Sequence, residues 1–527
     1  MSGIQLQGTN GCEDAQFPGL WSSPDGRRNI DIGKQIFCNS AVNMKNIVAV
    51  GFDMDYTLAQ YKPETFESLA YDGTVEKLVS NLGYPEELLK WSFDWTYMVR
   101  GLVLDKKRGN ILKMDRHKYV KVAYHGFRLI SKDEKVATYG NSFVRDAFDG
   151  PDYAHIDTLF SLAEAYLFAQ LVDFKDSNPG KISEVKDYSR MYNDVRSAVD
   201  MCHRDGTLKT LVAKDIKKYI NEDNSIVPML KMLKTSGRAV FLVTNSLWDY
   251  TNVVMNFVCG SQTANGGSAS LDWLKHFDFV ITGSAKPGFF HDENRANLFA
   301  VETDSGKLIN TDNGTPLAQV GSPDLDLPDN IPKLCKVFQG GNVGHLHKLL
   351  NVGSSSQVLY VGDHIYGDIL RSKKVLGWRT MLIVPELEKE VKVLSSSRDT
   401  RKKLQLLRSE RDQIEDQTHH LKWSLEHENV DGVEKEKMCS KLEVLEGQRA
   451  RVRAAHEESQ RIFHQKFHPV WGQLMKTGYQ NSRFAHQVER FACLYTSQVG
   501  NLGLYSPAKY YRPGEDFMPH ESDILSH

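Results

Sequence analysis

The stretch of sequence that decides the fold runs from residue 46 to residue 58 and reads NIVAVGFDMDYTL. Residues 46–52 form a short apolar run, which is the pattern of a strand buried on both faces of a parallel sheet. The run stops at Asp53, and Asp55 follows after one methionine. A buried strand that ends in two carboxylates predicts a polar site at the edge of the sheet.

Four later segments repeat the apolar pattern. They span residues 239–243, 277–282, 357–361 and 380–384. Stretches with helical patterning separate these runs, and strands that alternate with helices are typical of βαβ units. The sequence therefore predicts an α/β fold built on a doubly wound parallel sheet.

The stretch between the first two strands is too long for one crossover connection, so we expect an inserted domain over one edge of the sheet. Inside this insertion, residues 191–209 have the pattern of a helix and the turn that follows it. The predicted units are an N-terminal arm (1–45), a catalytic core (46–60 and 229–388), an inserted cap domain (61–228), a charged helical hairpin (389–463) and a C-terminal segment that packs on the core (464–527).

The predicted hairpin rests on a heptad pattern. Apolar residues recur at Leu407, Ile414 and Leu421, the pattern breaks at residues 429–432, and it resumes with Leu442, Leu445 and Val452. Such spacing favours two helices that pack against each other in antiparallel orientation. A single solvated helix with a bend is the alternative.

The composition excludes several classes of protein. The chain has 527 residues with 65 basic and 67 acidic side chains, so its formal net charge is -2. That balance provides no field for binding nucleic acid or an anionic membrane, and no apolar run is long enough to span a bilayer. The first residues lack a secretory signal pattern, and seven scattered cysteines are expected to stay reduced. We therefore expect a cytoplasmic protein.

Polar side chains stand where the predicted strands end. They are Asp53, Asp55, Thr244, Lys286, Asp363 and Asp368. Ligands of open α/β sheets bind outside the carboxyl ends of the strands, so we expect these side chains to converge there. Clustered carboxylates need a countercharge, and their oxygens suit a hard cation such as Mg²⁺. With a hydroxyl group and a lysine, they indicate a phosphoryl-transfer site.

Each residue of this set has an expected role. Asp53 is the nucleophile that forms an aspartyl-phosphate, and Asp55 is the proton donor to the leaving oxygen. The metal ion is expected between Asp53, Asp363 and the backbone carbonyl of Asp55, with Asp368 orienting a metal-bound water or Lys286. The residues expected to bind the phosphoryl group are Thr244, Asn245, Ser246 and Lys286.

Each motif alone also has an ordinary structural interpretation. An Asp-x-Asp pair is commonly a turn or a helix cap, and Thr-Asn-Ser after a strand is commonly an N-cap. A lysine before a proline is commonly just exposed. The ordered set, in which each member follows a buried strand, favours the catalytic interpretation.

Four motifs also carry a family resemblance: DMDYTL (53–58), VTNS (243–246), AKP (285–287) and GDHIYGD (362–368). They resemble the four motifs of the haloacid dehalogenase superfamily and, within it, those of the cytosolic purine 5′-nucleotidases that prefer IMP and GMP. The similarity extends from residue 30 to residue 522 and includes stretches without catalytic residues, such as RGLV at 100–103 and MPHES at 518–522.

This resemblance implies Mg²⁺-dependent hydrolysis of purine nucleoside monophosphates, with IMP and GMP preferred. It further implies transfer of the phosphoryl group to a nucleoside acceptor such as inosine. A homotetramer is implied as well, activated by ATP or a similar polyphosphate at a separate site.

The resemblance also assigns binding residues. The base-binding set is Phe160, Arg196, Asp200, His203 and Lys209, and the effector set is Arg145, Asp157, Tyr366, Lys374, Gln487 and Arg490. Positions 196, 200 and 203 share one helix face, although without the family an ordinary Arg–Asp pair would explain two of them. This chain departs from the family at Arg204, which replaces a tyrosine, and at Ser161 and Asp157, which replace asparagines. Asp157 would repel a polyphosphate unless it is paired.

Two alternatives to a purine nucleotidase stay open. The same core could act on a different phosphomonoester, because the cap pocket selects the substrate. A non-catalytic scaffold that works through the helical hairpin is the second alternative.

Overall fold

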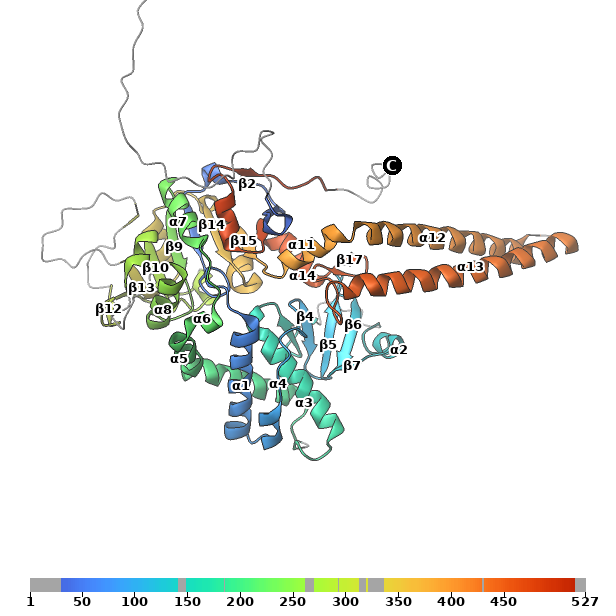
Figure 1. Ribbon diagram of the computed structural model, residues 1–527, viewed down its shortest axis with the longest axis horizontal. Coiled ribbons are helices and arrows are strands. Elements are labelled where there is room, and N and C mark those ends of the chain that lie inside the picture. The colour runs from blue at the N-terminus through green and yellow to red at the C-terminus, as the bar shows by residue number, and fades with distance from the viewer. Residues whose placement is uncertain are drawn as a thin grey trace, which may run out of the picture.

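The computed structural model describes residues 30–140, 148–183, 185–260, 270–291, 293–311, 319–320, 336–428 and 431–516. Figure 1 shows a core sheet with its helices, a second domain below it, and a pair of long helices that project to one side. The short helical turns are η1 (Ile32–Lys34), η2 (Met44–Asn46), η3 (Glu86–Lys90), η4 (Val136–Gly140), η6 (Leu159–Ser161), η7 (Asp272–His276), η8 (Gly288–Phe290), η9 (Ser355–Gln357), η10 (Ile365–Leu370) and η11 (Val499–Leu504).

The core sheet has ten strands within these ranges. In spatial order they are β1 (Phe37–Cys38), β18 (Leu494–Thr496), β15 (Arg379–Ile383), β14 (Val358–Gly362), β3 (Ala49–Phe52), β9 (Ala239–Val243), β10 (Phe279–Thr282), β13 (Val337–Gly340), β11 (Leu298–Val301) and β12 (Leu308–Asn310). The strands from β18 to β13 run parallel, whereas β1, β11 and β12 form antiparallel pairs at the two edges. The predicted parallel sheet is confirmed.

Separate apolar clusters cover the two faces of the sheet. Val50 and Phe52 of β3 belong to the cluster that contains residues of α7 (Ile226–Thr235) and α8 (Trp248–Val258). Ala49 belongs to the opposite cluster, which contains residues of α9 (Val343–Leu350). Successive residues of a strand point to opposite faces, so a strand buried on both sides must be apolar throughout. This explains why residues 49–52 read as one continuous apolar run.

The register of the central strands aligns their carboxyl ends. Phe52 lies opposite Val361 of β14 on one side and Leu242 of β9 on the other. The residues that follow these three strands therefore emerge in one row. The first predicted strand starts at Ala49 and not at residue 46, because η2 occupies the residues before it.

The segment between β3 and β9 forms the second domain. Its sheet, as far as the described residues show it, has the strand order β7 (Arg128–Leu129), β6 (Val120–His125), β5 (Asn110–Met114), β4 (Leu102–Asp105) and β8 (Tyr153–Ile156). Its helices are α1 (Pro63–Leu82), α2 (Lys132–Lys135), α3 (Leu162–Ser177), α4 (Tyr188–Arg204), α5 (Thr207–Lys214) and α6 (Ile216–Tyr219). The helix predicted within residues 191–209 is α4, and the turn predicted after it lies at Gly206, whose φ is +73°, directly before α5. A glycine tolerates this left-handed conformation without strain.

The helical hairpin projects from the body of the molecule (Figure 1). It consists of α12 (Arg398–His427) and α13 (Gly432–Gln465), and α11 (Leu387–Ser396) connects it to the core sheet. Ile414 of α12 and Leu445 and Val452 of α13 are buried between the helices, and Leu407 and Leu421 pack against them. Two helices with an apolar seam are therefore present, and not one bent helix.

The C-terminal segment joins the other parts of the molecule. It contains β16 (Lys476–Thr477), β17 (Gln480–Asn481), α14 (Arg483–Phe491), β18 and β19 (Tyr510–Tyr511). Trp471 is fully buried, and its indole Nε1 donates to the carbonyl of Tyr97 in the second domain at 2.8 Å. Within the segment predicted as an arm, β1 pairs with β18, and β2 (Val42–Asn43) pairs with β19.

No helix among the described residues is both long and apolar enough to cross a membrane. The cysteines that fall in the described ranges carry free thiols: Cys38, Cys202, Cys259, Cys439 and Cys493.

Candidate active site

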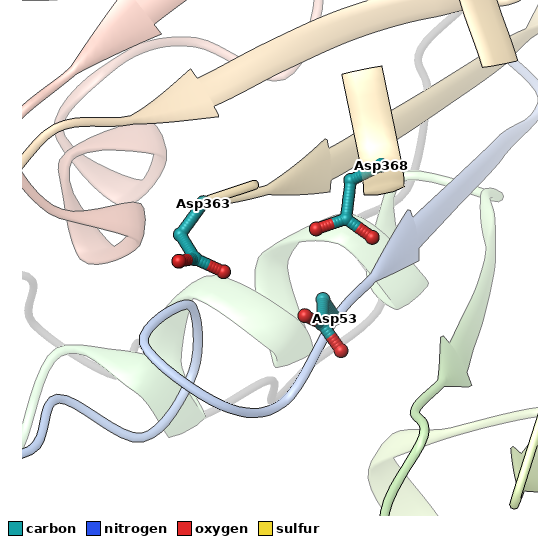
Figure 2. A group of neighbouring side chains, drawn as sticks. All are labelled: Asp53, Asp363 and Asp368. Carbon is teal, nitrogen blue, oxygen red and sulfur yellow. The ribbon is translucent and has the colours of Figure 1, made fainter. Parts of the chain in front are cut away.

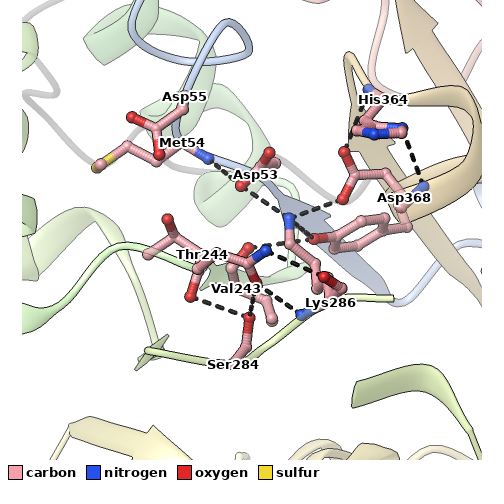
Figure 3. Close-up of polar contacts among 12 residues, drawn as sticks. Asp53, Met54, Asp55, Val243, Thr244, Ser284, Lys286, His364 and Asp368 are labelled. Atoms are coloured by element: carbon pink, nitrogen blue, oxygen red, sulfur yellow. Dashed lines mark hydrogen bonds and ion pairs between the residues drawn. The ribbon is translucent and has the colours of Figure 1, made fainter. Parts of the chain in front are cut away.

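The site begins at the carboxyl end of β3. Asp53 follows the last strand residue, its backbone N–H donates to the carbonyl of Val361 at 2.9 Å, and its Oδ1 accepts from the N–H of Met54 at 2.7 Å. The chain then turns sharply, with Tyr56 at a φ of +53°. The turn leaves Asp53 facing the end of β14, as Figure 3 shows.

Three carboxylates meet at this point (Figure 2). One oxygen each from Asp53, Asp363 and Asp368 lies within 4.8 Å of the others, and all three residues are buried. Asp363 follows β14, and Asp368 lies one helical turn later in η10. Gly362 makes this approach possible, because a Cβ atom there would stand 2.5 Å from the Asp368 side chain.

Lys286 supplies the countercharge within the protein. Its Nζ lies 2.8 Å from Oδ1 of Asp53 and 2.7 Å from Oδ1 of Asp368, and it donates to the hydroxyl of Tyr360 at 3.2 Å. The other oxygen of Asp368 accepts from the backbone N–H of His364 at 3.3 Å. One ammonium group facing three carboxylates leaves a surplus of negative charge.

This surplus appears in the pKa values. Burial raises the pKa of Asp53 from 3.8 to about 7, against the attraction of Lys286 and with the repulsion of Asp368 and Asp55. Burial and the repulsion of Asp368 and Asp53 raise the pKa of Asp363 well above its usual range. Burial alone would lower the pKa of Lys286, but Asp368 and Asp53 raise it well above its ordinary value. Both directions indicate a site that attracts additional positive charge.

The residues fit a divalent metal ion. Oδ2 of Asp363 is buried and has no hydrogen-bond partner among the described residues, although a buried polar atom normally has one. Carboxylate oxygens are the ligands that Mg²⁺ prefers, and a +2 charge would balance the surplus. Asp53 and Asp363 therefore provide a suitable pair of ligands, and Asp368 is occupied by Lys286.

Asp55 points away from this cluster and toward the second domain. Its Oδ1 accepts from the hydroxyl of Tyr61 at 2.6 Å, and its Oδ2 accepts from the hydroxyl of Ser246 at 2.9 Å. Tyr61 in turn shares a hydrogen bond of 2.9 Å with the hydroxyl of Tyr250. Asp55 is therefore held in place by hydrogen bonds from Ser246 of the core and from Tyr61 at the start of the second domain.

The Thr-Asn-Ser turn after β9 mainly positions other groups. The side-chain oxygen of Asn245 accepts from the N–H of Lys286 at 2.6 Å, and its Nδ2 donates to the Lys286 carbonyl at 3.1 Å. Oγ1 of Thr244 accepts from the N–H of Ser246 at 3.1 Å. Asn245 therefore holds the loop that carries Lys286 in position. This positioning role was not predicted, and the phosphate-binding role of Asn245 stays a prediction.

Besides Tyr61 and Tyr250, the site contains Tyr360 and Arg100, which were not predicted from the sequence either. The hydroxyl of Tyr360 in β14 donates a hydrogen bond to the carbonyl of Val243 at 3.2 Å. The same hydroxyl accepts the hydrogen bond from Lys286. Arg100, whose side chain is fully buried, donates to the carbonyl of Asp363 at 3.2 Å and forms an ion pair with Glu386. No local pattern marks these contacts, because their partners lie far away in the chain.

Two of the residues assigned to base binding share a cavity. Phe160 in η6 and His203 of α4 line one cavity between α1, α3, α4 and α5. Arg196 forms ion pairs with Glu164 at 2.9 Å and with Asp200 at 3.1 Å. These pairs match the ordinary structural interpretation of this helix face.

Lys209 completes the predicted base-binding set. Its Nζ lies 5.2 Å from the centre of the Tyr250 ring, which is a cation–π distance. Through Tyr250 and Tyr61, this lysine is connected to Asp55. Of the predicted base-binding set, Lys209 is thus linked through two tyrosines to the turn that carries Asp55.

The residues assigned to the effector site are placed as follows. Tyr366 accepts a hydrogen bond from Nε2 of Gln487, and the guanidinium of Arg490 lies over the Phe491 ring. Lys374 is exposed at the end of α10 (Arg371–Lys374). Arg145 lies outside the described residues.

Asp157 is paired, which removes the repulsion expected from it. It is buried and forms an ion pair with Arg483 of α14, which also donates to the Tyr366 hydroxyl at 3.5 Å. Arg483 was not predicted, and a sequence signal for it is absent because the two partners lie 326 positions apart.

The chain is similar in sequence to known proteins. The model of the 5′ nucleotidase family matches residues 36–523. A 5′-nucleotidase domain-containing protein of Dictyostelium discoideum is 28% identical over 93% of this chain and 75% of its own length. The 5′-nucleotidase domain-containing protein 2 of Rattus norvegicus is 26% identical over 93% of this chain and 80% of its own length. A solved structure described as a predicted phosphoglycolate phosphatase from Haemophilus somnus is 10% identical, covers 64% of this chain and 86% of its own, and has a TM-score of 0.26.

Proposed function

The chain belongs to the 5′ nucleotidase family, a family of phosphoric monoester hydrolases, and we propose that it hydrolyses purine nucleoside monophosphates with IMP and GMP preferred. The observation that carries the proposal is the group of Asp53, Asp363 and Asp368 around Lys286 at the carboxyl edge of the sheet. Such a site can hold a phosphoryl group between a nucleophile, a lysine and a metal ion.

In the proposed reaction, a carboxylate oxygen of Asp53 attacks phosphorus. The new bond joins Asp53 to phosphorus, and the bond from phosphorus to the 5′-oxygen breaks. Asp55 gives its proton to the leaving 5′-oxygen and later takes one from the water that hydrolyses the aspartyl-phosphate. Tyr61 and Ser246 hold Asp55 in place, so the proton is delivered from a fixed position.

The remaining polar groups act on the charge of the phosphoryl oxygens. Lys286 and the hydroxyl of Thr244 would neutralise that charge, and Asn245 holds the lysine loop. Mg²⁺ held by Asp53, Asp363 and the carbonyl of Asp55 would lower the repulsion between carboxylate and phosphate. Asp368 keeps Lys286 in position through the contact at 2.7 Å.

We propose that the aspartyl-phosphate can also pass its phosphoryl group to a nucleoside hydroxyl, because a hydroxyl can replace the attacking water. The position of Phe160 and His203 beside the catalytic turn supports a purine as the bound base. Activation by ATP or a similar polyphosphate, a homotetramer and a cytoplasmic location are further parts of the proposal, and they are supported by the family resemblance.

A different phosphomonoester is the second candidate substrate. Arg204 is exposed at the end of α4, one residue after His203, where relatives are expected to have an aromatic side chain. Together with Ser161 next to Phe160, it changes the chemistry beside the pocket. A substrate with more negative charge than IMP would suit this arginine.

Phosphate release tests the proposal. The purified protein with Mg²⁺ is offered IMP, GMP, AMP, CMP and p-nitrophenyl phosphate, with and without ATP. Fast release from IMP and GMP supports the proposed function, and a higher rate with ATP supports the activator. Release from p-nitrophenyl phosphate alone would favour the second candidate, and no release by folded protein would contradict catalysis.

A further inference from the structure

A buried arginine of the second domain reaches an aspartate of the catalytic edge of the core sheet. Arg100 lies just before β4 and is 1% exposed, and its Nη1 donates to the backbone carbonyl of Asp363 at 3.2 Å. Asp363 is one of the two carboxylates that fit the metal ion, and its Oδ2 has no hydrogen-bond partner among the described residues. The second domain therefore holds the backbone of a residue whose side chain is available to a metal ion.

Glu386 holds the guanidinium of Arg100 from the other side. Nε of Arg100 donates to Oε1 of Glu386 at 2.9 Å, and Nη2 donates to Oε2 at 2.6 Å. Such a bidentate pair fixes both the distance and the plane of the guanidinium. Glu386 is the residue before α11, which connects the core sheet to the helical hairpin. The guanidinium thus bridges this connection and the carbonyl of Asp363.

The backbone around Arg100 is also fixed by its neighbours. Gly101 has a φ of +84°, and its N–H donates to the carbonyl of Ile156 at 2.6 Å. A Cβ atom at Gly101 would stand 2.5 Å from Cβ of Phe484, so this backbone lies directly against α14. The guanidinium carbon of Arg100 lies 5.2 Å from the centre of the Phe484 ring, which is a cation–π distance. Arg100 therefore has one position, set by the second domain, α11 and α14 together.

We propose that Arg100, held by Glu386, is a positioning residue for the magnesium site and raises the affinity for Mg²⁺ through the backbone of Asp363. This inference rests on the proposed function, which places Mg²⁺ on Asp53 and Asp363. A ligand whose own backbone is already held does not have to be ordered when the ion binds, so less binding free energy is lost. Arginine has no acceptor atom, so Arg100 acts through Asp363 and is not itself a ligand.

The charges of the pair suit this role. A lone guanidinium beside Asp363 would repel a divalent cation. The carboxylate of Glu386 offsets the charge of Arg100, so the hydrogen bond reaches Asp363 without a net positive charge beside the metal site. The side chain of Glu386 is 32% exposed, whereas that of Arg100 is fully buried. Glu386 is therefore the partner that can be changed with less disturbance of the packing.

Two substitutions test the pair, and a third is the matched control. Arg100→Met removes the donor and the charge, whereas Glu386→Gln keeps the shape of the partner and removes its charge. Arg108→Met is the control, because Arg108 also belongs to an ion pair of the second domain, with Asp105 at 3.0 Å. Thermal unfolding in a series of Mg²⁺ concentrations gives the Kd of Mg²⁺ without substrate, since a ligand that binds only the folded state raises the midpoint.

For Arg100→Met we expect the Kd of Mg²⁺ to rise by about tenfold or more, the usual effect of removing a group that holds a metal ligand. Glu386→Gln should raise the Kd by about threefold or more, because the charge of Arg100 is then no longer offset. Arg108→Met should lower the unfolding midpoint in EDTA and leave the Kd of Mg²⁺ unchanged. At saturating Mg²⁺, kcat of Arg100→Met should approach that of the wild type, because Arg100 acts on the metal and not on phosphorus.

The Kd of Mg²⁺ decides the inference. An unchanged Kd in Arg100→Met, with or without a lower midpoint in EDTA, would overturn it and leave the proposed function in place. An equal rise in Arg108→Met would also overturn it, because the loss of any ion pair in the second domain would then be sufficient. If Arg100→Met does not fold, an unchanged Kd in Glu386→Gln overturns the inference. A wild-type midpoint that does not respond to Mg²⁺ would instead overturn the magnesium site of the proposed function, and this inference with it.

Discussion

Replacing Asp53 by asparagine should abolish phosphate release and also stabilise the metal-free protein. Both effects follow from the same carboxylate. Asparagine has the shape of aspartate but is a poor nucleophile, so the aspartyl-phosphate cannot form. It also carries no charge, so it relieves the repulsion between Asp53, Asp363 and Asp368.

The size of the stabilisation follows from the pKa of Asp53. The carboxyl group has a pKa of about 7 in the fold and 3.8 as its ordinary value, and burial is the main cause. The folded state therefore holds the proton more tightly, and the free energy of unfolding falls as the pH rises from about 4 to 7. Each pH unit in this window costs about 1.4 kcal/mol, so the total cost at pH 8 is on the order of 4 kcal/mol.

Urea unfolding of both proteins in the presence of EDTA measures this difference. We expect the free energy of unfolding of Asp53→Asn to exceed that of the wild type by about 4 kcal/mol at pH 8 and by about 1.6 kcal/mol at pH 5. Added Mg²⁺ should narrow the gap at pH 8, because a ligand that binds only the folded wild type stabilises it. Asp152→Asn, at an exposed position, should change stability by less than about 0.5 kcal/mol at both pH values.

A particular result would refute this reasoning. If Asp53→Asn were no more stable than the wild type at pH 8 in EDTA, the Asp53 carboxylate would not be destabilised by its burial and by its neighbouring carboxylates, as the structure indicates. If the variant still released phosphate at the wild-type rate, Asp53 would not be the nucleophile. The two outcomes are independent, so charge crowding and nucleophilic attack are tested separately.

Lys286→Met should lower kcat by about 10² to 10³ in steady-state assays, because one preorganised charge on the phosphoryl group is lost; a loss of only a few-fold would contradict that role. Arg483→Met should reduce the free energy of unfolding by about 3–5 kcal/mol, since Asp157 is left buried without a counterion. In the double variant with Asp157→Leu, urea unfolding should show much of this loss recovered, and additive losses would show that the pair is not coupled. Arg196→Ala should raise KM for IMP more than for p-nitrophenyl phosphate, and equal changes would place this arginine outside the base pocket.

The strand ends could be predicted because each is marked locally. A continuous apolar run indicates a strand that is buried on both faces. The polar residue that ends the run marks the point where the strand leaves the sheet, as at Phe52 and Asp53. The heptads at Leu407 and Ile414 likewise record one helix seam. Predictions from such patterns fail by a few residues where a turn intervenes, as η2 does before β3.

Local patterns did not decide the ion pairs of the site. The sequence left open whether Asp368 orients a metal-bound water or Lys286, and the structure places Lys286 between Asp53 and Asp368. The Thr-Asn-Ser sequence predicted phosphate binding. It did not indicate that the Asn245 side chain forms two hydrogen bonds with the backbone of Lys286. Such choices depend on rotamers, which packing from several elements selects.

The sequence by itself determined five buried strands of the sheet, the polar residues at their ends and the helical hairpin, because the evidence for these lies within a few neighbouring residues. Only the tertiary structure decided that Asp157 is neutralised by Arg483, that Arg100 reaches the carbonyl of Asp363, and that Glu386 pairs with Arg100. The physical reason is that a buried charge takes its partner from whatever element packs against it, and that element can lie hundreds of residues away in the chain.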